Sequence, residues 1–191
     1  DVISSSNETS QTSLMPSLNL YGSYKLGHTQ FLDVDLTATY TDNEYVRKYR
    51  EDDYFSHTKA NENLYNVTFS TNYNIQLKHN NSFGLNLTHC HSVSSSTYEG
   101  DFNNWSHLWT TETMLMGQYN HNLGKVYISL QYGSDLLQYR LHGNEMKRYL
   151  SPHANILLNY RINSEHSMLC GLHTGNSNPP MEWINNVSQD L

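Results

Sequence analysis

Charged residues are scarce in this chain, and their scarcity excludes one class of partner. Lys, Arg, Asp and Glu make up 15% of the 191 residues, against about 25% in an average soluble domain. Only 11 residues are basic, the formal net charge is -7, and no basic run exceeds the pairs Arg47-Lys48 and Lys147-Arg148. Phosphate binding needs clustered Lys and Arg, so we expect no nucleic-acid partner.

Long apolar runs and an export signal are also missing, and cysteine is rare. The chain has no run of 18 or more apolar residues, so it predicts no transmembrane helix. Cys90 and Cys170 are too few for a disulfide framework, and alternation places them on opposite faces of their strands, so we expect free thiols. The first residues contain no signal peptide, which predicts a mature protein or a fragment.

Neutral polar and aromatic residues take the place of the missing charges. The chain has 15 Tyr, three Trp and five Phe, together with many Asn, Ser, Thr, His and Gln. A disordered chain would be poor in aromatics and rich in charge, so disorder is a poor fit. By itself, this composition suits a soluble all-β domain as well as it suits a membrane barrel.

Apolar and polar residues alternate along most of the chain, which is the pattern of β-strands with one apolar face. Such segments cover the ranges 18–26, 32–40, 65–77, 83–88, 110–120, 126–132, 154–162 and 168–172. Short turns centred near 28, 79, 122 and 164 join them in pairs, which predicts four hairpins. We therefore expect about eight antiparallel strands.

The connections between the hairpins are of a different kind. They cover the ranges 42–62, 94–109 and 142–152, and are polar, charged or rich in aromatics. Short turns at one end of a sheet and long loops at the other are typical of bacterial outer-membrane barrels, whose turns are periplasmic and whose loops are extracellular. The predicted fold is an all-β, antiparallel, up-and-down transmembrane β-barrel or barrel segment. Residues 1–191 form one such segment, with no plug domain.

The polar side of each strand carries Asn, Ser, Thr and Gln rather than Lys and Glu. Uncharged hydrogen-bonding groups suit a wet or plugged barrel lumen, so we expect the pair Asp33 and Asp35 to be solvated lumen residues. Tyrosines near the ends of the apolar runs are candidates for interfacial girdles, although tyrosine also favours strands in general. They are Tyr24, Tyr40, Tyr73, Tyr119 and Tyr160.

The ranges 15–21, 26–30 and 32–40 (MPSLNLY, LGHTQ and LDVDLTATY) resemble the outer-membrane β-barrel family of Bacteroides-type bacteria, relatives of the TonB-dependent receptors. The range 175–191 is similar to a barrel segment leading into a long extracellular loop. The resemblance implies a middle section of a barrel of about 22 strands, with a location in the outer membrane. Outer-membrane lipid is the implied partner. An energising inner-membrane complex and a surface lipoprotein are partners only of a full receptor.

Candidate binding residues are the aromatics in the predicted long loops: Tyr45, Tyr49, Tyr54, Phe55, Trp105 and Trp109. Exposed aromatics anchor sugars and peptides, and they also pack over a barrel mouth. His89 and His91 share one strand face and Cys90 takes the other, so the three cannot converge on one metal. We expect no catalytic residue, no metal and no cofactor, and we predict that the chain is not an enzyme.

Three functional hypotheses remain open. The first is a TonB-dependent-receptor-like barrel that imports a glycan, a peptide or a metal chelate. The second is a soluble β-sheet module that binds carbohydrate through the loop aromatics, for which the apolar faces must pack on one another. The third is a self-contained eight-stranded barrel with a structural role, in which side chains fill the interior.

Overall fold

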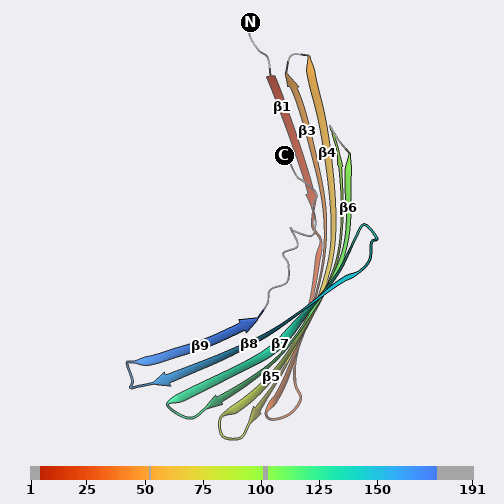
Figure 1. The fold of residues 1–191 in the computed structure, drawn as a ribbon. Helices are drawn as coiled ribbons and strands as arrows, with labels where there is room; N and C mark the ends of the chain where they lie inside the picture. Colours follow the sequence, from red (N-terminus) through yellow and green to blue (C-terminus); the bar gives the residue numbers. More distant parts are fainter. Residues whose placement is uncertain (1–4, 52, 101–102, 176–191) are drawn as a thin grey trace.

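The computed structural model describes residues 5–51, 53–100 and 103–175, nearly all of which lie in one antiparallel sheet (Figure 1). No helix among the described residues is long and apolar enough to cross a membrane. The strands are β1 (Ser5–Leu14), β2 (Ser17–Lys25), β3 (Gln30–Glu51), β4 (Tyr54–Leu77), β5 (Asn81–Glu99), β6 (Asn104–Asn122), β7 (Val126–Leu141), β8 (Lys147–Arg161) and β9 (Ser167–Gly175).

Strands β1 and β2 form one continuous edge of the sheet. Leu14 pairs with Asp42 and Ser17 pairs with Thr39, so the register does not slip between them. Pro16 interrupts the ladder because it has no N–H to donate, although its carbonyl oxygen still accepts a bond of 3.1 Å from the Tyr40 N–H. Proline is tolerated at such an edge position. The sheet is therefore eight strands wide, as the alternation predicts.

The four short turns lie where the sequence predicts them. Strands β4 and β5 are joined through His79 and Asn80, which have φ of 62° and 58°. This left-handed backbone suits the twist of a tight hairpin. Between β8 and β9, the Asn163 side chain accepts bonds of 2.9 and 2.8 Å from the backbone N–H groups of Glu165 and His166.

The predicted long loops, in contrast, are mostly strand. Strand β3 continues to Glu51 and β4 begins at Tyr54, so nearly all of the predicted loop 42–62 is a ladder. Likewise, β5 continues to Glu99 and β6 begins at Asn104. The connection between β7 and β8 consists only of residues 142–146. The prediction of loops was wrong here because both faces of these extensions are polar, and without an apolar face the alternation disappears.

The sheet is strongly bent (Figure 1), and burial identifies its concave side. Apart from Gly133, the buried residues among those described are Thr58, Ser106, Leu108, Thr110, Thr111, Ser129, Leu137 and Ser151. Cross-strand pairing puts all of them except Thr111 on the polar face that also holds Asp33 and Asp35. Side chains converge on the inside of a bend and diverge on the outside. The polar face is therefore concave and the apolar face is convex.

The strands are staggered in a regular way. The last residue pair before each short turn marks where its two strands end. From the β2–β3 turn to the β8–β9 turn, this pair moves along the ladder by three, then one, then two residues, a total of six residues over six strands. One residue per strand, with a rise of about 3.3 Å and a strand spacing of about 4.8 Å, corresponds to a tilt of about 35°. Transmembrane barrels have tilts of about 35–45°.

Candidate functional site

The convex face carries a continuous apolar belt. One row across the sheet, from β4 to β9, contains Ile75, Phe83, Tyr119, Leu130, Ile156 and Leu172. Within the described residues no second layer covers this belt, and Leu130, in the interior of the sheet, is 41% exposed. The apolar faces do not pack on one another, so the condition for a soluble module is not met.

The belt has the height of a membrane barrel band. On β3 it runs from Leu32 to Tyr40 and is followed by Asp42. Eight rises of about 3.3 Å at a tilt of about 35° span about 22 Å along the membrane normal, close to the ~25 Å of outer-membrane barrels.

All five tyrosines proposed as girdle residues point to this convex face, as their pairing shows. Tyr40 stands opposite Tyr65 at the upper edge of the belt, while Tyr24, Tyr119 and Tyr160 lie near the short turns.

The concave face is a wall of uncharged hydrogen-bonding groups. Asn86 donates to Asn72 over 2.6 Å, and Asn155 donates to Gln131 over 3.2 Å. Asp33 accepts bonds from the hydroxyl groups of Ser23 and Tyr21, at 2.6 and 3.3 Å. Asp35 lies on the same face and accepts from Thr37 over 3.3 Å. The two carboxylates therefore belong to a polar wall in which hydroxyl groups are their hydrogen-bond partners.

Three of the six candidate binding aromatics lie together on the concave face, above the belt. Tyr45 and Tyr49 are on β3 and Tyr54 is on β4. The rings of Tyr49 and Tyr54 are 6.2 Å apart, and the Arg47 guanidinium lies 5.9 Å from the Tyr49 ring centre. The Tyr49 hydroxyl donates to Glu51, and this bond raises the pKa of the phenol above its ordinary value.

Sequence reasoning missed three more tyrosines of this surface. Tyr98 on β5, Tyr139 on β7 and Tyr149 on β8 share the concave face with the first three. The rings of Tyr139 and Tyr149 are stacked, with centres 5.9 Å apart and planes at 5°. Strand parity alone indicates them once the strands are known to continue beyond the belt. We call these six residues the tyrosine surface: Tyr45, Tyr49, Tyr54, Tyr98, Tyr139 and Tyr149.

Phe55, Trp105 and Trp109 lie on the opposite, convex face. Pairing places Phe55 beside Arg50, Trp105 beside Thr97, and Trp109 beside Val93 at the upper edge of the belt. These three side chains point away from the concave wall. Trp109 contacts His91 edge-on, with ring centres 5.4 Å apart, which suits an interfacial aromatic better than a lumen contact.

The His89-Cys90-His91 segment is split between the faces, as parity predicts. His89 and His91 lie on the convex face, where their Nδ1 atoms are 2.9 and 3.3 Å from the hydroxyls of Thr113 and Thr111. Cys90 lies on the concave face and donates to Asn66 over 3.1 Å. Both cysteines are free, and Cys170 is on the convex face beside Leu158. Across residues 5–51, 53–100 and 103–175, no group of three His, Cys, Asp or Glu side chains forms a metal site.

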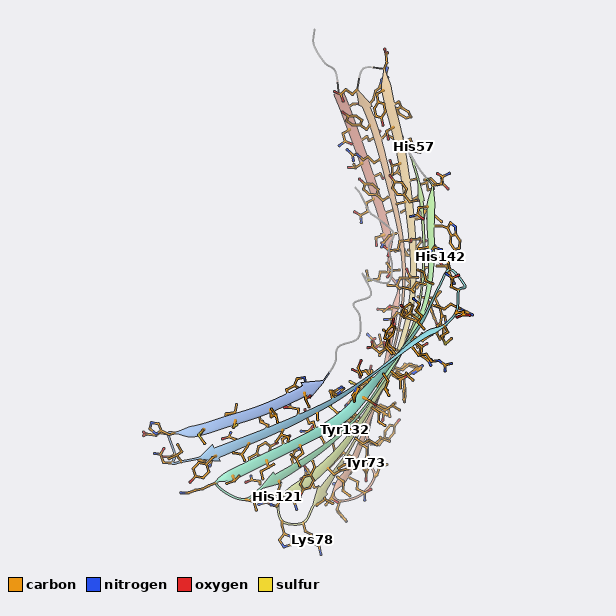
Figure 2. The ribbon with its side chains drawn as sticks, in the orientation of Figure 1. His57, Tyr73, Lys78, His121, Tyr132 and His142 are labelled. Atoms are coloured by element: carbon orange, nitrogen blue, oxygen red, sulfur yellow. The ribbon has the colours of Figure 1, made fainter. Side chains whose placement is uncertain are left out.

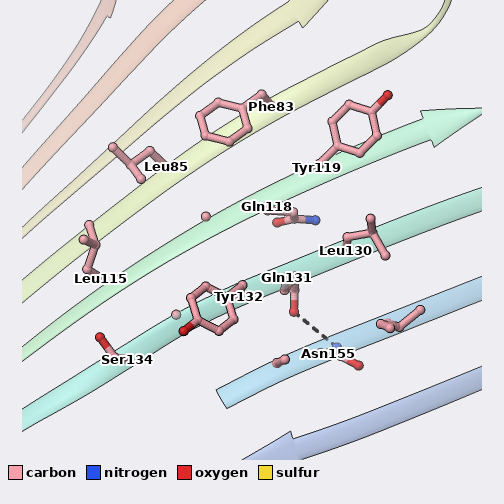
Figure 3. A pocket seen from close by; sticks show the side chains of 14 residues that line it. Phe83, Leu85, Leu115, Gln118, Tyr119, Leu130, Gln131, Tyr132, Ser134 and Asn155 are labelled. Carbon is pink, nitrogen blue, oxygen red and sulfur yellow. Dashed lines mark hydrogen bonds between the residues drawn. The ribbon is translucent and has the colours of Figure 1, made fainter. Parts of the chain in front are cut away.

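A hollow of about 560 Å³ indents the convex belt (Figure 3). Its floor is formed where Gly117 on β6 and Ala154 on β8 occupy one row with Leu85 and Tyr132. Larger side chains surround it on four strands: Phe83, Leu115, Tyr119, Leu130 and Ile156. The missing side chain at Gly117 therefore creates an apolar depression on the surface that faces away from the polar wall.

Two solved structures that share this fold are a ferric citrate transporter and a ferric preacinetobactin receptor. The ferric citrate transporter FecA matches 85% of this chain with a TM-score of 0.65 and 9% sequence identity. BauA, the ferric preacinetobactin receptor of Acinetobacter baumannii, matches 87% of it with a TM-score of 0.54 and 10% identity. The chain spans only 27% and 30% of those two proteins. No protein-family model and no curated protein sequence matches it.

The chain folds as the wall of an outer-membrane β-barrel. Its location is the bacterial outer membrane, and its short turns and its long strand extensions lie at opposite ends of the sheet. Because the sequence identities are so low, the likeness to FecA and BauA establishes the fold alone. It gives no support to an origin in Bacteroides-type bacteria, which stays a prediction.

Proposed function

We propose that this chain is one barrel segment of a TonB-dependent-receptor-like protein that takes up a nutrient, and that it is not an enzyme. The observation that carries the proposal is a wide, open sheet of eight strands whose fold matches 27% of the FecA chain and 30% of the BauA chain. Within the described residues β9 does not pair with β1 or β2. This disfavours the self-contained eight-stranded barrel.

The tyrosine surface supplies the ligand contacts in this proposal. It lies on the concave face above the belt, where a ligand enters from outside. Flat aromatic rings with hydroxyl groups suit sugars, peptides and the organic shell of a metal chelate, because they offer both apolar area and hydrogen bonds. Asp33 and Asp35 lie deeper on the same wall, near the periplasmic turns, and act as solvated lumen groups.

The partners follow from the receptor plan. The convex belt contacts outer-membrane lipid. As part of a full receptor, the chain acts with an energising inner-membrane complex and a surface lipoprotein. No nucleic acid is involved.

Growth of a deletion strain, complemented with the full-length protein, tests the proposal. Ferric chelates, oligosaccharides and peptides serve in turn as the limiting nutrient. Tyr54→Ala is compared with Phe55→Ala, its sequence neighbour on the convex face. We expect one nutrient to need the protein and the energising complex, with growth reduced by Tyr54→Ala alone. Equal growth of the deletion strain on every nutrient, or recovery of the protein as a monomer without detergent, would refute the proposal.

A further inference from the structure

The alternation of apolar and polar residues breaks on β6 at Met114-Leu115-Met116. Leu115 lies in the convex belt, so strand parity places both methionines on the concave face. Met114 pairs with Asp135, and Met116 pairs with Gly133 on β7. A thioether sulfur is only a weak hydrogen-bond acceptor, so the chemistry of the two methionines sets this part of the wall apart from the hydrogen-bonding groups around it.

His153 on β8 leans toward these methionines. It pairs with Gly133, so it lies in one row with Met116. A Cβ atom added at Gly133 would lie 3.0 Å from the Met116 Cα atom and 3.2 Å from His153 Nε2. The imidazole ring therefore covers Gly133, and its Nε2 atom lies within reach of the flexible Met116 side chain. Tyr132, the neighbour of Gly133 in the chain, marks this position in Figure 2, below the bend of the sheet.

Asp135 faces the other nitrogen of this ring. Its Oδ2 atom lies 3.9 Å from His153 Nδ1. A carboxylate beside one imidazole nitrogen favours a proton on that nitrogen and leaves the other free to bind a metal. The Oδ1 atom of Asp135 is buried and has no hydrogen-bond partner among the described residues. Such an oxygen is costly unless a positive charge lies nearby, so Asp135 indicates a cation at this place.

We propose that Met114, Met116 and His153 bind one Cu(I) ion on the concave wall, through the two sulfur atoms and Nε2. Asp135 is the residue that positions the imidazole. Thioether sulfur selects soft Cu(I) over harder divalent ions, and imidazole also suits copper. The single positive charge of the ion balances the carboxylate of Asp135. Sequence alone did not indicate this site, because its ligands lie on two strands that only the pairing brings together.

The site is accessible from the concave side and suits a soft ion better than a hard one. Met114, Met116, Asp135 and His153 are half-buried, and the His153 side chain is 16% exposed. A zinc ion takes about four ligands from imidazole, thiolate and carboxylate groups. Within the described residues, no group of three such side chains supplies them. The commitment is therefore to a soft monovalent ion that accepts thioether ligands.

Competition with a chromophoric Cu(I) chelator under reducing conditions measures the binding. The full-length protein in detergent carries Cys90→Ser and Cys170→Ser as its background, because both free thiols would also bind Cu(I). We expect Asp135→Asn to weaken Cu(I) binding about tenfold, and Met116→Leu or His153→Gln to weaken it further. X-ray absorption at the copper edge should show sulfur and nitrogen neighbours in the background protein. The same neighbours should remain in Asp135→Asn, because the carboxylate positions the ring and does not bind the ion.

Met168→Leu and His89→Gln are the matched controls, because both residues lie on the convex face, and neither should change the binding. Three results would overturn the proposal: binding by Met116→Leu and His153→Gln within twofold of the background protein, a copper spectrum without sulfur, or equally tight binding of Zn²⁺. If His153→Gln does not assemble, Met116→Leu decides, because leucine and methionine are interchangeable in volume. The experiment measures binding to the purified protein and not growth on a nutrient, so its failure leaves the proposed uptake function standing.

Discussion

Replacing Leu130 by arginine tests the orientation of the whole sheet. Leu130 lies on the convex face of β7, near the middle of a belt that begins at Val126 and ends at Leu136. An arginine on the lipid face costs about 2–4 kcal/mol at the bilayer midplane and about 0–1 kcal/mol near the interface. We therefore expect Leu130→Arg to destabilise the barrel by about 2–4 kcal/mol, and Val126→Arg by less than about 1 kcal/mol.

The control is Gln131→Arg, one residue along the same strand. Gln131 points to the concave face and accepts one bond from Asn155, so its replacement should cost only the ~0.5–1.5 kcal/mol of a neutral hydrogen bond. The assay is equilibrium unfolding of the full-length protein in lipid vesicles with guanidinium, with the slope m checked for constancy. Equal costs for Leu130→Arg and Gln131→Arg would refute the assignment of the convex face to lipid.

Three further predictions follow from glycine and cysteine positions. Gly133→Ala should destabilise the barrel by about 1–3 kcal/mol, because the added Cβ would lie 2.5 Å from the Leu115 carbonyl oxygen. Gly117→Ala should cost less, because the atom nearest to its Cβ lies at 3.8 Å. The denaturation midpoints of the two variants test this difference. Gly124 has φ of 79°, so Gly124→Ala should cost about 1–2 kcal/mol, while Gly27→Ala, which meets nothing within 4 Å and lacks a left-handed φ, is the control; equal midpoints would contradict the strain. A fluorophore on Cys170 in Cys90→Ser should be quenched by spin-labelled acyl chains, and one on Cys90 in Cys170→Ser should not, because the two thiols lie on opposite faces.

The alternation of residues within the belt was enough to predict the strands and turns there. Rows such as that of Leu32, Val34 and Leu36 against Asp33 and Asp35 fix which residues share a face, and pairing confirms the same division on β3 and β4. The turns near 79 and 164 were also predictable, because Asn and His tolerate the left-handed backbone and Asn caps a turn.

The extensions above the belt were not predictable by the same reasoning. Residues 42–51 have water on both sides, so Glu44 and Lys59 on the convex face are as polar as Asn43 on the concave face. A polar strand and a polar loop have the same composition. For this reason the sequence alone could not place Tyr54 and Phe55 on opposite faces. Adjacent residues in a strand point to opposite faces, whereas adjacent residues in a loop have no fixed faces.

The unequal lengths of the strand extensions give the extracellular mouth a slant. Strand β3 continues 11 residues beyond Tyr40, the last residue of its belt, which is about 30 Å of height at about 2.7 Å per tilted residue. Strand β7 continues only five residues beyond Leu136, about 14 Å. A bulky solute that approaches over β7 and β8 therefore passes a low edge of the wall. The taller strands β3 and β4, which are hydrogen-bonded to each other, lie beyond that edge. Tyr45, Tyr49 and Tyr54 lie on these taller strands, on the concave face, and so point toward the approaching solute.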